Sequence, residues 1–215
     1  NTTMKTPSQL PNKYDSYDAL KIKNQIIEYE LGIAPEGWDQ YKAQDIIDKY
    51  RYPANDEEKW RYPNVDWADE LFKDFAMSYN ANINISGGTK FVKYFASVDY
   101  LHEGDLFESW DNNRGYQSGY GYDRNNVRSN LDFQLTKSTV LSTNLFGAYA
   151  VKKSPWGATG NEYAMWQGAY SVPPDVFWPQ YEDGTWGYYP SNTVGATNSA
   201  QNLALSGIEQ TTTTR

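Results

Sequence analysis

The chain has 215 residues with 27 acidic and 19 basic side chains, which give a formal net charge of −8 and a pI of about 4.7. This charge argues against a nucleic-acid binder, because contacts to phosphates require clustered lysine and arginine. Since the chain has no cysteine, neither a disulfide framework nor a thiolate metal site is possible.

The composition is polar and aromatic at the same time. Mean hydropathy is −0.79, yet 16% of the residues are aromatic, with 19 tyrosines and 8 tryptophans. The lack of any long apolar run excludes a transmembrane helix. It does not exclude a transmembrane barrel, whose strands alternate and therefore average out to polar. The N-terminus has no basic-then-apolar signal peptide, so we expect a mature product or an internal piece of a longer chain.

The first third of the chain predicts short helices after an extended lead-in over residues 1–14. One helix begins at Asp15 or Ser16 and runs to about Leu31, and a second covers residues 40–50. Asp66 is placed to cap a further helical turn. Because these helices are short and acidic, we expect them to pack on another part of the protein.

Residues 78–101 predict a β-hairpin. Apolar and small polar residues alternate strictly over residues 78–86, and the alternation resumes over residues 91–100. The Gly87-Gly88 pair between them supplies the positive φ angles of a tight turn. We therefore expect strands over residues 78–87 and 90–101.

The same alternation predicts a second hairpin, with strands over residues 126–136 and 139–151, and the start of a fifth strand near residues 207–215. Each strand is close to the length that a tilted strand needs to cross a bilayer. Four or five such strands cannot close a barrel and leave unpaired edges. We therefore expect this chain to be part of a larger polypeptide.

The connections between these strands alternate in length. Tight turns join the strands within each hairpin, whereas long loops cover residues 102–125 and 152–206. Short turns at one rim and long loops at the other are typical of outer-membrane barrels. The sequence thus predicts a mainly β fold, an antiparallel up-and-down meander within a large transmembrane β-barrel, with short N-terminal helices and two long extracellular loops. A soluble sheet capped by the N-terminal helices is the competing interpretation.

Four segments, in order along the chain, resemble SusC/RagA-type TonB-dependent transporters of Bacteroidota. The first is YPNVDW at residues 62–67 with the following ELF at residues 70–72, and the second is NINISGGT at residues 82–89. The strand at residues 94–104 (YFASVDYLHEG) and the segment at residues 126–132 (NVRSNLD) complete the resemblance.

This resemblance implies part of an energised importer of the bacterial outer membrane, with a barrel of about 22 strands. It implies that residues 1–76 connect the plug to the barrel and that residues 77–215 form the first barrel strands. The implied partners are outer-membrane lipid, a SusD-type surface lipoprotein, a glycan or peptide ligand, and TonB through an N-terminal region that this sequence does not include. Without a plug and most of a barrel, the chain is not expected to transport anything alone.

Neither enzyme chemistry nor a cofactor is expected. Acidic residues are plentiful, but no spacing singles out a catalytic carboxylate pair. His102 is the only histidine, which excludes a multi-histidine metal site, and we interpret it as a residue of the loop that follows a strand.

Aromatic residues of the two long loops are the ligand or partner candidates, since aromatic platforms can stack on sugar faces. The same residues can instead pack the loops on themselves, contact the lipoprotein or sit at the membrane interface. The candidates are Trp110, Tyr116, Tyr120, Tyr122, Trp156, Trp166, Trp178, Tyr181 and Trp186.

Apolar strand positions are the candidates for contact with lipid. They are Tyr79, Ala81, Ile83, Ile85, Val92, Tyr94, Val98, Tyr100, Leu131, Phe133, Leu145 and Tyr149. The alternative function, from a different class, is a secreted soluble β-rich carbohydrate-binding module with aromatic loops.

Overall fold

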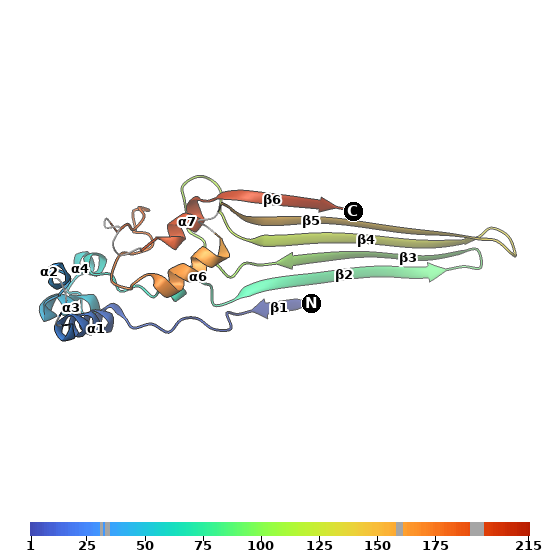
Figure 1. Cartoon of the computed structure of the whole chain (residues 1–215). Coiled ribbons are helices and arrows are strands. Elements are labelled where there is room, and N and C mark those ends of the chain that lie inside the picture. The colour runs from blue at the N-terminus through green and yellow to red at the C-terminus, as the bar shows by residue number, and fades with distance from the viewer. Residues whose placement is uncertain (31, 33–34, 158–160, 190–195) are drawn as a thin grey trace.

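Six strands form one antiparallel sheet in which neighbours in sequence are neighbours in space (Figure 1). This computed structural model describes residues 1–30, 32, 35–157, 161–189 and 196–215. The strands are β1 (Thr2–Lys5), β2 (Ala76–Gly88), β3 (Val92–Glu103), β4 (Gly121–Gln134), β5 (Val140–Trp156) and β6 (Gly207–Thr214). The predicted mainly β, up-and-down meander is therefore confirmed, and the sheet is open, as an arc of a β-barrel would be.

The structure contains each expected strand but extends several of them. β3 continues to Glu103, so His102 lies in this strand and not in the following loop as expected. β4 begins at Gly121 rather than near residue 126, and β5 continues to Trp156. The extensions follow from pairing: Tyr122 lies opposite Glu103 on one side and Lys152 on the other. Because this stretch lacks clean alternation of apolar and polar residues, its strand character is not visible in the sequence.

The N-terminal lead-in contains a strand that the sequence does not predict. Residues of β1 pair with the beginning of β2, from Thr2 opposite Tyr79 to Lys5 opposite Ala76. Residues 6–75 therefore connect two adjacent strands, whereas the sequence suggested a segment lying before the first strand. A four-residue strand is too short for periodicity to reveal it, and only its pairing partner identifies it.

All helices lie beyond one end of the sheet, and the tight turns lie at the other (Figure 1). We call this helical end the cap. Among the described residues, none of the helices has the length and apolar character required to cross a bilayer. The helices are α1 (Ser16–Tyr29), α2 (Pro35–Trp38), α3 (Gln44–Arg51), α4 (Asp56–Arg61), α5 (Trp67–Leu71), α6 (Glu162–Ser171) and α7 (Ser199–Leu205).

The first helices begin where capping groups are available. The Asp15 carboxylate accepts the Asp18 N–H at 2.9 Å, so α1 starts as expected; it ends at Tyr29, and position 31 lies outside the described residues. The second predicted helix, α3, starts at Gln44 rather than residue 40. The reason is that the Asn24 amide binds the carbonyl and the N–H of Lys42, which holds this backbone out of the helix.

The YPNVDW segment organises the centre of the cap. As expected, the Asp66 carboxylate caps α5 by accepting the N–H groups of Ala68 and Asp69. Trp67 is fully buried, packs edge-on against Phe177 and donates its indole N–H to the Pro173 carbonyl at 3.1 Å. These contacts tie a segment near residue 67 to one about a hundred residues later.

The core of the protein lies in the cap and not in the sheet. Its larger cluster joins α5, α6 and α7 and comprises Val65, Trp67, Leu71, Phe72, Phe107, Met165, Ala169, Val172, Phe177, Ala200 and Leu203. A smaller cluster of Leu20, Ile47 and Tyr50 holds α1 against α3. The short helices thus pack on one another and on the long connections, which gives them the tertiary support that their length requires.

The turn between β2 and β3 differs from the prediction. Gly87 and Gly88 are extended residues of β2, and neither has a positive φ. The turn is made by Thr89, whose hydroxyl accepts the N–H groups of Phe91 and Val92 at 3.1 and 3.2 Å. Gly87 has another role: a Cβ there would lie 2.5 Å from the Tyr94 hydroxyl, so glycine leaves room for the tyrosine ring.

Candidate functional site

One face of the sheet carries all twelve residues expected to contact lipid. The register places Ile83 opposite Val98 and Val98 opposite Val127, and the remaining candidates follow at alternate positions. Within the described residues these side chains lie open: Ile83 is 77% exposed and Leu145 67%. A broad apolar strand face without a covering layer requires contact with lipid or with another protein.

The other face is polar over most of its length. It carries Asn80, Asn82 and Asn84 on β2, while β3 and β4 contribute charged residues such as Asp99 and Arg124. An asparagine–aspartate contact crosses two of its strands, because the Asn126 amide donates to Asp99 at 2.9 Å. An apolar face backed by a polar face is the arrangement of a barrel wall between lipid and a hydrated lumen.

A pocket of about 570 Å³ lies where the polar face meets the cap. We call it the mouth pocket. The last polar-face row before the cap forms one side of it, with Glu103, Tyr122 and Lys152 on adjacent strands. Lys5, which lies opposite Ala76 and therefore two residues beyond this row on the same face, forms an ion pair with Glu103 at 3.6 Å. The cap contributes α6 to the opposite side through Glu162 and Trp166.

An unbroken run of aromatic rings forms the apolar wall of the mouth pocket. The ring centroids are 4.4 Å apart for Trp166 and Phe72, 5.2 Å apart for Phe72 and Phe107, and 5.4 Å apart for Phe107 and Tyr120. Offset rings at these distances pack favourably. The pocket therefore combines an aromatic surface with charges of both signs, which suits a ligand that has apolar and polar groups.

Asp105 holds the two ends of the β3–β4 connection together beside this wall. One carboxylate oxygen accepts the Phe107 N–H at 3.0 Å, and the other accepts the Tyr120 N–H at 2.9 Å. Burial raises the pKa of Asp105 above its ordinary value, although these two hydrogen bonds oppose the shift. Burial is also the main cause that raises the pKa of Tyr120 to about 12.

Most of the loop aromatics expected to contact a ligand or partner pack within the cap. Trp110, Tyr120, Trp166, Trp178 and Trp186 lie against the larger core cluster. This placement agrees with packing of the loops on themselves, one of the roles left open by the sequence. Of these five, Tyr120 and Trp166 also line the mouth pocket.

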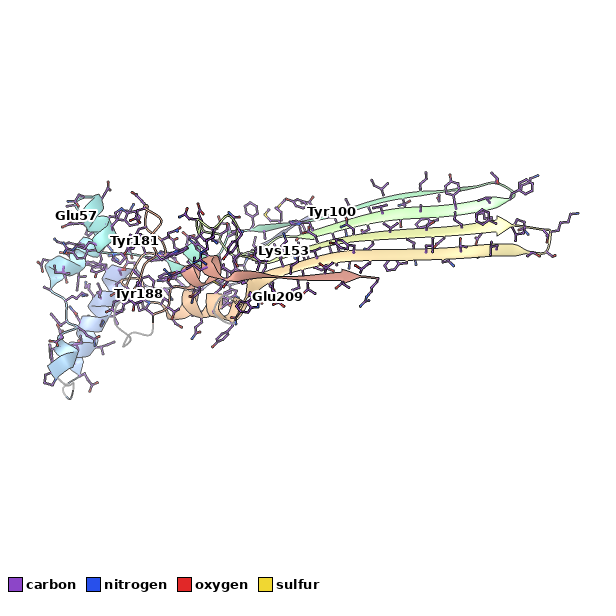
Figure 2. All side chains as sticks on the ribbon, turned by 90° about the horizontal axis from the view of Figure 1, so that it is seen from above. Glu57, Tyr100, Lys153, Tyr181, Tyr188 and Glu209 are labelled. Atoms are coloured by element: carbon purple, nitrogen blue, oxygen red, sulfur yellow. The ribbon has the colours of Figure 1, made fainter. Side chains whose placement is uncertain are left out.

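The other four expected aromatics are spread over the molecule. Tyr181 packs against Trp60 with ring centroids 5.7 Å apart, and it lies with Tyr188 in the cap (Figure 2). The Tyr116 hydroxyl donates to the Leu205 carbonyl, Trp156 is exposed at the end of β5, and Tyr122 belongs to β4 and lines the mouth pocket. The nine residues therefore do not form one binding platform.

Comparison with solved structures identifies a similar arrangement in a transporter. The chain is similar to the structure of the RagAB peptide transporter, with a TM-score of 0.52 and 18% identity over 89% of this chain and 22% of that one. It is also similar to the RagAB peptide importer in its "closed-closed" state, with a TM-score of 0.53 and 18% identity over 88% of this chain and 22% of that one. At this identity the likeness establishes the fold.

A sequence relative points the same way. TonB-dependent receptor P26 of Formosa agariphila is 35% identical over 75 residues, which are 35% of this chain and 6% of that protein. Over this stretch the chain is therefore similar to a TonB-dependent receptor. No family model matches the chain. The chain spans about a fifth of the solved chains and a much smaller share of the curated relative, and these relatives are transporters or receptors rather than enzymes.

Replacing Asp105 with asparagine is expected to loosen the β3–β4 connection by about 1–3 kcal/mol, the cost of one buried hydrogen bond left unmade. An amide has one acceptor oxygen, so its NH₂ group must face the N–H of either Phe107 or Tyr120. Hydrogen exchange at these two amides in the intact protein measures the effect. Asp111→Asn is the matched control, because among the described residues the Asp111 side chain accepts one N–H, from Asn113, and an amide oxygen can accept the same hydrogen bond.

The same pair of variants tests the pH dependence of this connection. The pKa of Asp105 is higher in the folded protein than in the unfolded chain. The contribution of Asp105 to the stability of the connection is therefore fully present below the unfolded pKa, and it is lost as the pH rises through the folded pKa. Hydrogen-exchange protection of the Phe107 and Tyr120 amides, corrected for intrinsic rates, should therefore fall in the wild type as the pH rises from the unfolded to the folded pKa of Asp105. In Asp105→Asn it should stay level over the same pH range. Identical pH profiles in the two proteins would contradict this role for Asp105.

Several residues of the mouth pocket were not visible in the sequence. Phe72 is the extended residue that directly follows α5, while Asp105, Lys152 and Glu162 lay in presumed loops. The position of Lys152 beside Tyr122 could be assigned only from the register of β4 with β5. One usable signal was present: Asn161 before Glu162 matches an N-cap, and its side chain does accept the Ala164 N–H.

Proposed function

We propose that this chain forms part of the barrel wall and the outer cap of a TonB-dependent importer in the bacterial outer membrane. One observation carries the proposal: twelve apolar positions share one face of an antiparallel meander that has tight turns at one end and long, folded connections at the other. The likenesses to a TonB-dependent receptor and to the RagAB transporter support it.

In this proposal the cap lies outside the cell and the tight turns face the periplasm, because outer-membrane barrels keep their short turns on the periplasmic side. The cargo is a large nutrient, a glycan or an oligopeptide. The partners are a SusD-type lipoprotein at the cap, and TonB acting through a region outside this sequence. The name of the RagAB structures, a peptide transporter, makes a peptide cargo the first to test.

The alternative, a soluble carbohydrate-binding module, receives no support from the sheet. A soluble sandwich would cover the apolar face with a second layer. In the described part of the chain, Ile83, Ile85 and Leu145 are 77%, 60% and 67% exposed.

Labelling of single cysteines in the intact transporter, in outer membranes, tests the orientation of the sheet. A cysteine at Ile83 should be shielded by lipid from a water-soluble maleimide, whereas one at the adjacent Asn84 should react from the lumen, because successive strand residues point to opposite faces. Equal labelling of the two positions would refute the proposed membrane face.

A further inference from the structure

A second pocket, of about 420 Å³, continues from the mouth pocket along the polar face of the sheet. We call it the basin. The two pockets share Tyr122 and Lys152, so a ligand can extend from one into the other. The basin opens on the polar face because β4 and β5 present Arg124, Asn126 and Ala150 to the same side.

The basin exists because short side chains meet in the middle of the face. Ala148 and Ala150 on β5 lie beside Thr211 and Thr213 on β6, and none of these residues reaches far above the sheet. Longer side chains surround this floor, namely Tyr122, Arg124, Phe146, Lys152 and Arg215. The depth of the basin is therefore set by the difference in side-chain length between neighbouring positions.

Three of the lining side chains carry positive charge, namely Arg124, Lys152 and Arg215, and the first two lie close together on adjacent strands. Arg124 is opposite Ala150, and Lys152 is two residues farther along β5, so Arg124 and Lys152 are diagonal neighbours. Diagonal neighbours on antiparallel strands have Cβ atoms about 7–8 Å apart, a spacing that long side chains can bridge. Both cationic groups can therefore reach one anion in the basin.

Neither cation is neutralised within the described part of the chain. Two of the neighbouring acids have other partners, since Asp99 accepts from Asn126 and Glu103 pairs with Lys5. The third, Glu162, lines the mouth pocket on the cap side, and in the described residues it forms no ion pair with Lys152. The Nε of Arg124 is buried there and has no hydrogen-bond acceptor among the described residues. A buried donor without an acceptor is unfavourable and is rare in proteins. We therefore expect the Arg124 side chain to bind a hydrogen-bond acceptor.

We propose that the basin binds a carboxylate of the transported molecule through Arg124 and Lys152, while the adjoining part of that molecule lies against the aromatic wall of the mouth pocket. This inference rests on the proposed import function. The guanidinium of arginine matches the geometry of a carboxylate and binds it through two hydrogen bonds, and the lysine adds a point charge. An acidic peptide and a uronic-acid oligosaccharide both supply this group.

Calorimetric titration of the intact, detergent-purified transporter tests the proposal with two matched pairs of probes. Hexaglutamate is compared with a neutral glycine–serine hexapeptide, and tetragalacturonate with maltotetraose. We expect one acidic probe to bind at least about tenfold more tightly than its neutral counterpart, because a hydrogen bond to a charged group contributes about 1.5–3 kcal/mol. The acidic probe that binds identifies the source of the carboxylate.

Single variants locate the site. Arg124→Gln and Lys152→Gln should each weaken binding of the acidic probe by about tenfold or more. Arg128→Gln is the control, because Arg128 is on the same strand and the same face, opposite Phe146, but does not line the basin. It should leave the affinity within about twofold, since screening by salt limits the effect of a distant surface charge.

Three outcomes would overturn the proposal. The first is equal binding of acidic and neutral probes, and the second is an equal loss of affinity in the Arg128 variant, which would indicate general attraction between charges. The third is that the wild-type protein binds neither acidic probe while Arg124→Gln lowers the melting temperature, which would assign the basin to another segment of the transporter. Each of these leaves the labelling test at Ile83 and Asn84 unaffected, so failure of the carboxylate site is distinguishable from failure of the import function.

Discussion

Trp67→Ala is expected to destabilise the cap by about 3–5 kcal/mol, the usual cost of removing a large buried aromatic side chain. Trp67 is fully buried in the larger core cluster, where it packs edge-on against Phe177 and donates to Pro173. Alanine would leave a cavity and free the Pro173 carbonyl from its indole partner. The loss is large because one side chain joins α5 to the segment that follows α6.

The effect should be confined to the cap, because the sheet has its own ladder of hydrogen bonds. Hydrogen exchange in the intact protein is expected to show a protection loss of about two to four orders of magnitude at amides of α6 and α7, since each factor of ten corresponds to about 1.4 kcal/mol. Amides in the middle of β3 and β4 should keep their protection. Trp156→Ala, at a position that is 67% exposed, is the control and should change neither region. Unchanged protection in the Trp67 variant would show that the cap does not depend on this core.

Ile83→Arg is expected to oppose insertion of the protein into the membrane by about 2–4 kcal/mol, the cost of an arginine on the lipid-facing side of a barrel near the bilayer midplane. Ile83 lies well inside β2, opposite Val98, and is 77% exposed. A charge placed there would have to reach water through hydrocarbon. Neighbouring apolar side chains on the same face offer it no partner.

Asn84→Arg supplies the matched comparison, because it adds the same side chain one residue away on the opposite, polar face. We expect this variant to assemble like the wild type. Urea titration of folding into lipid vesicles, with the intact transporter, measures both free energies. Similar stability of the two variants would contradict a lipid-facing role for Ile83, and a larger loss at Asn84 would reverse the proposed orientation.

The alternation of residues by itself determined the strands and their faces. Period-2 patterning over residues 78–86 is a local property, because successive strand residues must point to opposite sides whatever the rest of the chain does. For that reason the twelve apolar candidates share one face in the structure. The helix N-caps at Asp15 and Asp66 could also be predicted from the sequence. The reason is that an N-cap depends only on the capping residue and the next three residues.

Turn chemistry was less certain, and the Gly87-Gly88 pair shows why. Glycine permits a positive φ without requiring it. In the structure the pair stays extended, because Gly87 and Gly88 pair with Tyr94 and Lys93 on the neighbouring strand, and Thr89 forms the turn instead. A local motif was therefore reassigned by a contact across the hairpin.

Only the tertiary structure decided what the long connections do. Trp67 meets Pro173, and Trp178 meets Lys59, through contacts that span more than a hundred residues. No local pattern encodes such pairings, because they depend on how the strands bring the ends of each connection together. The same holds for β1, for the mouth pocket and for the approach of Arg124 to Lys152, whose positions on a common face follow from strand register. Register is a property of two strands at once, so a single stretch of sequence cannot specify it.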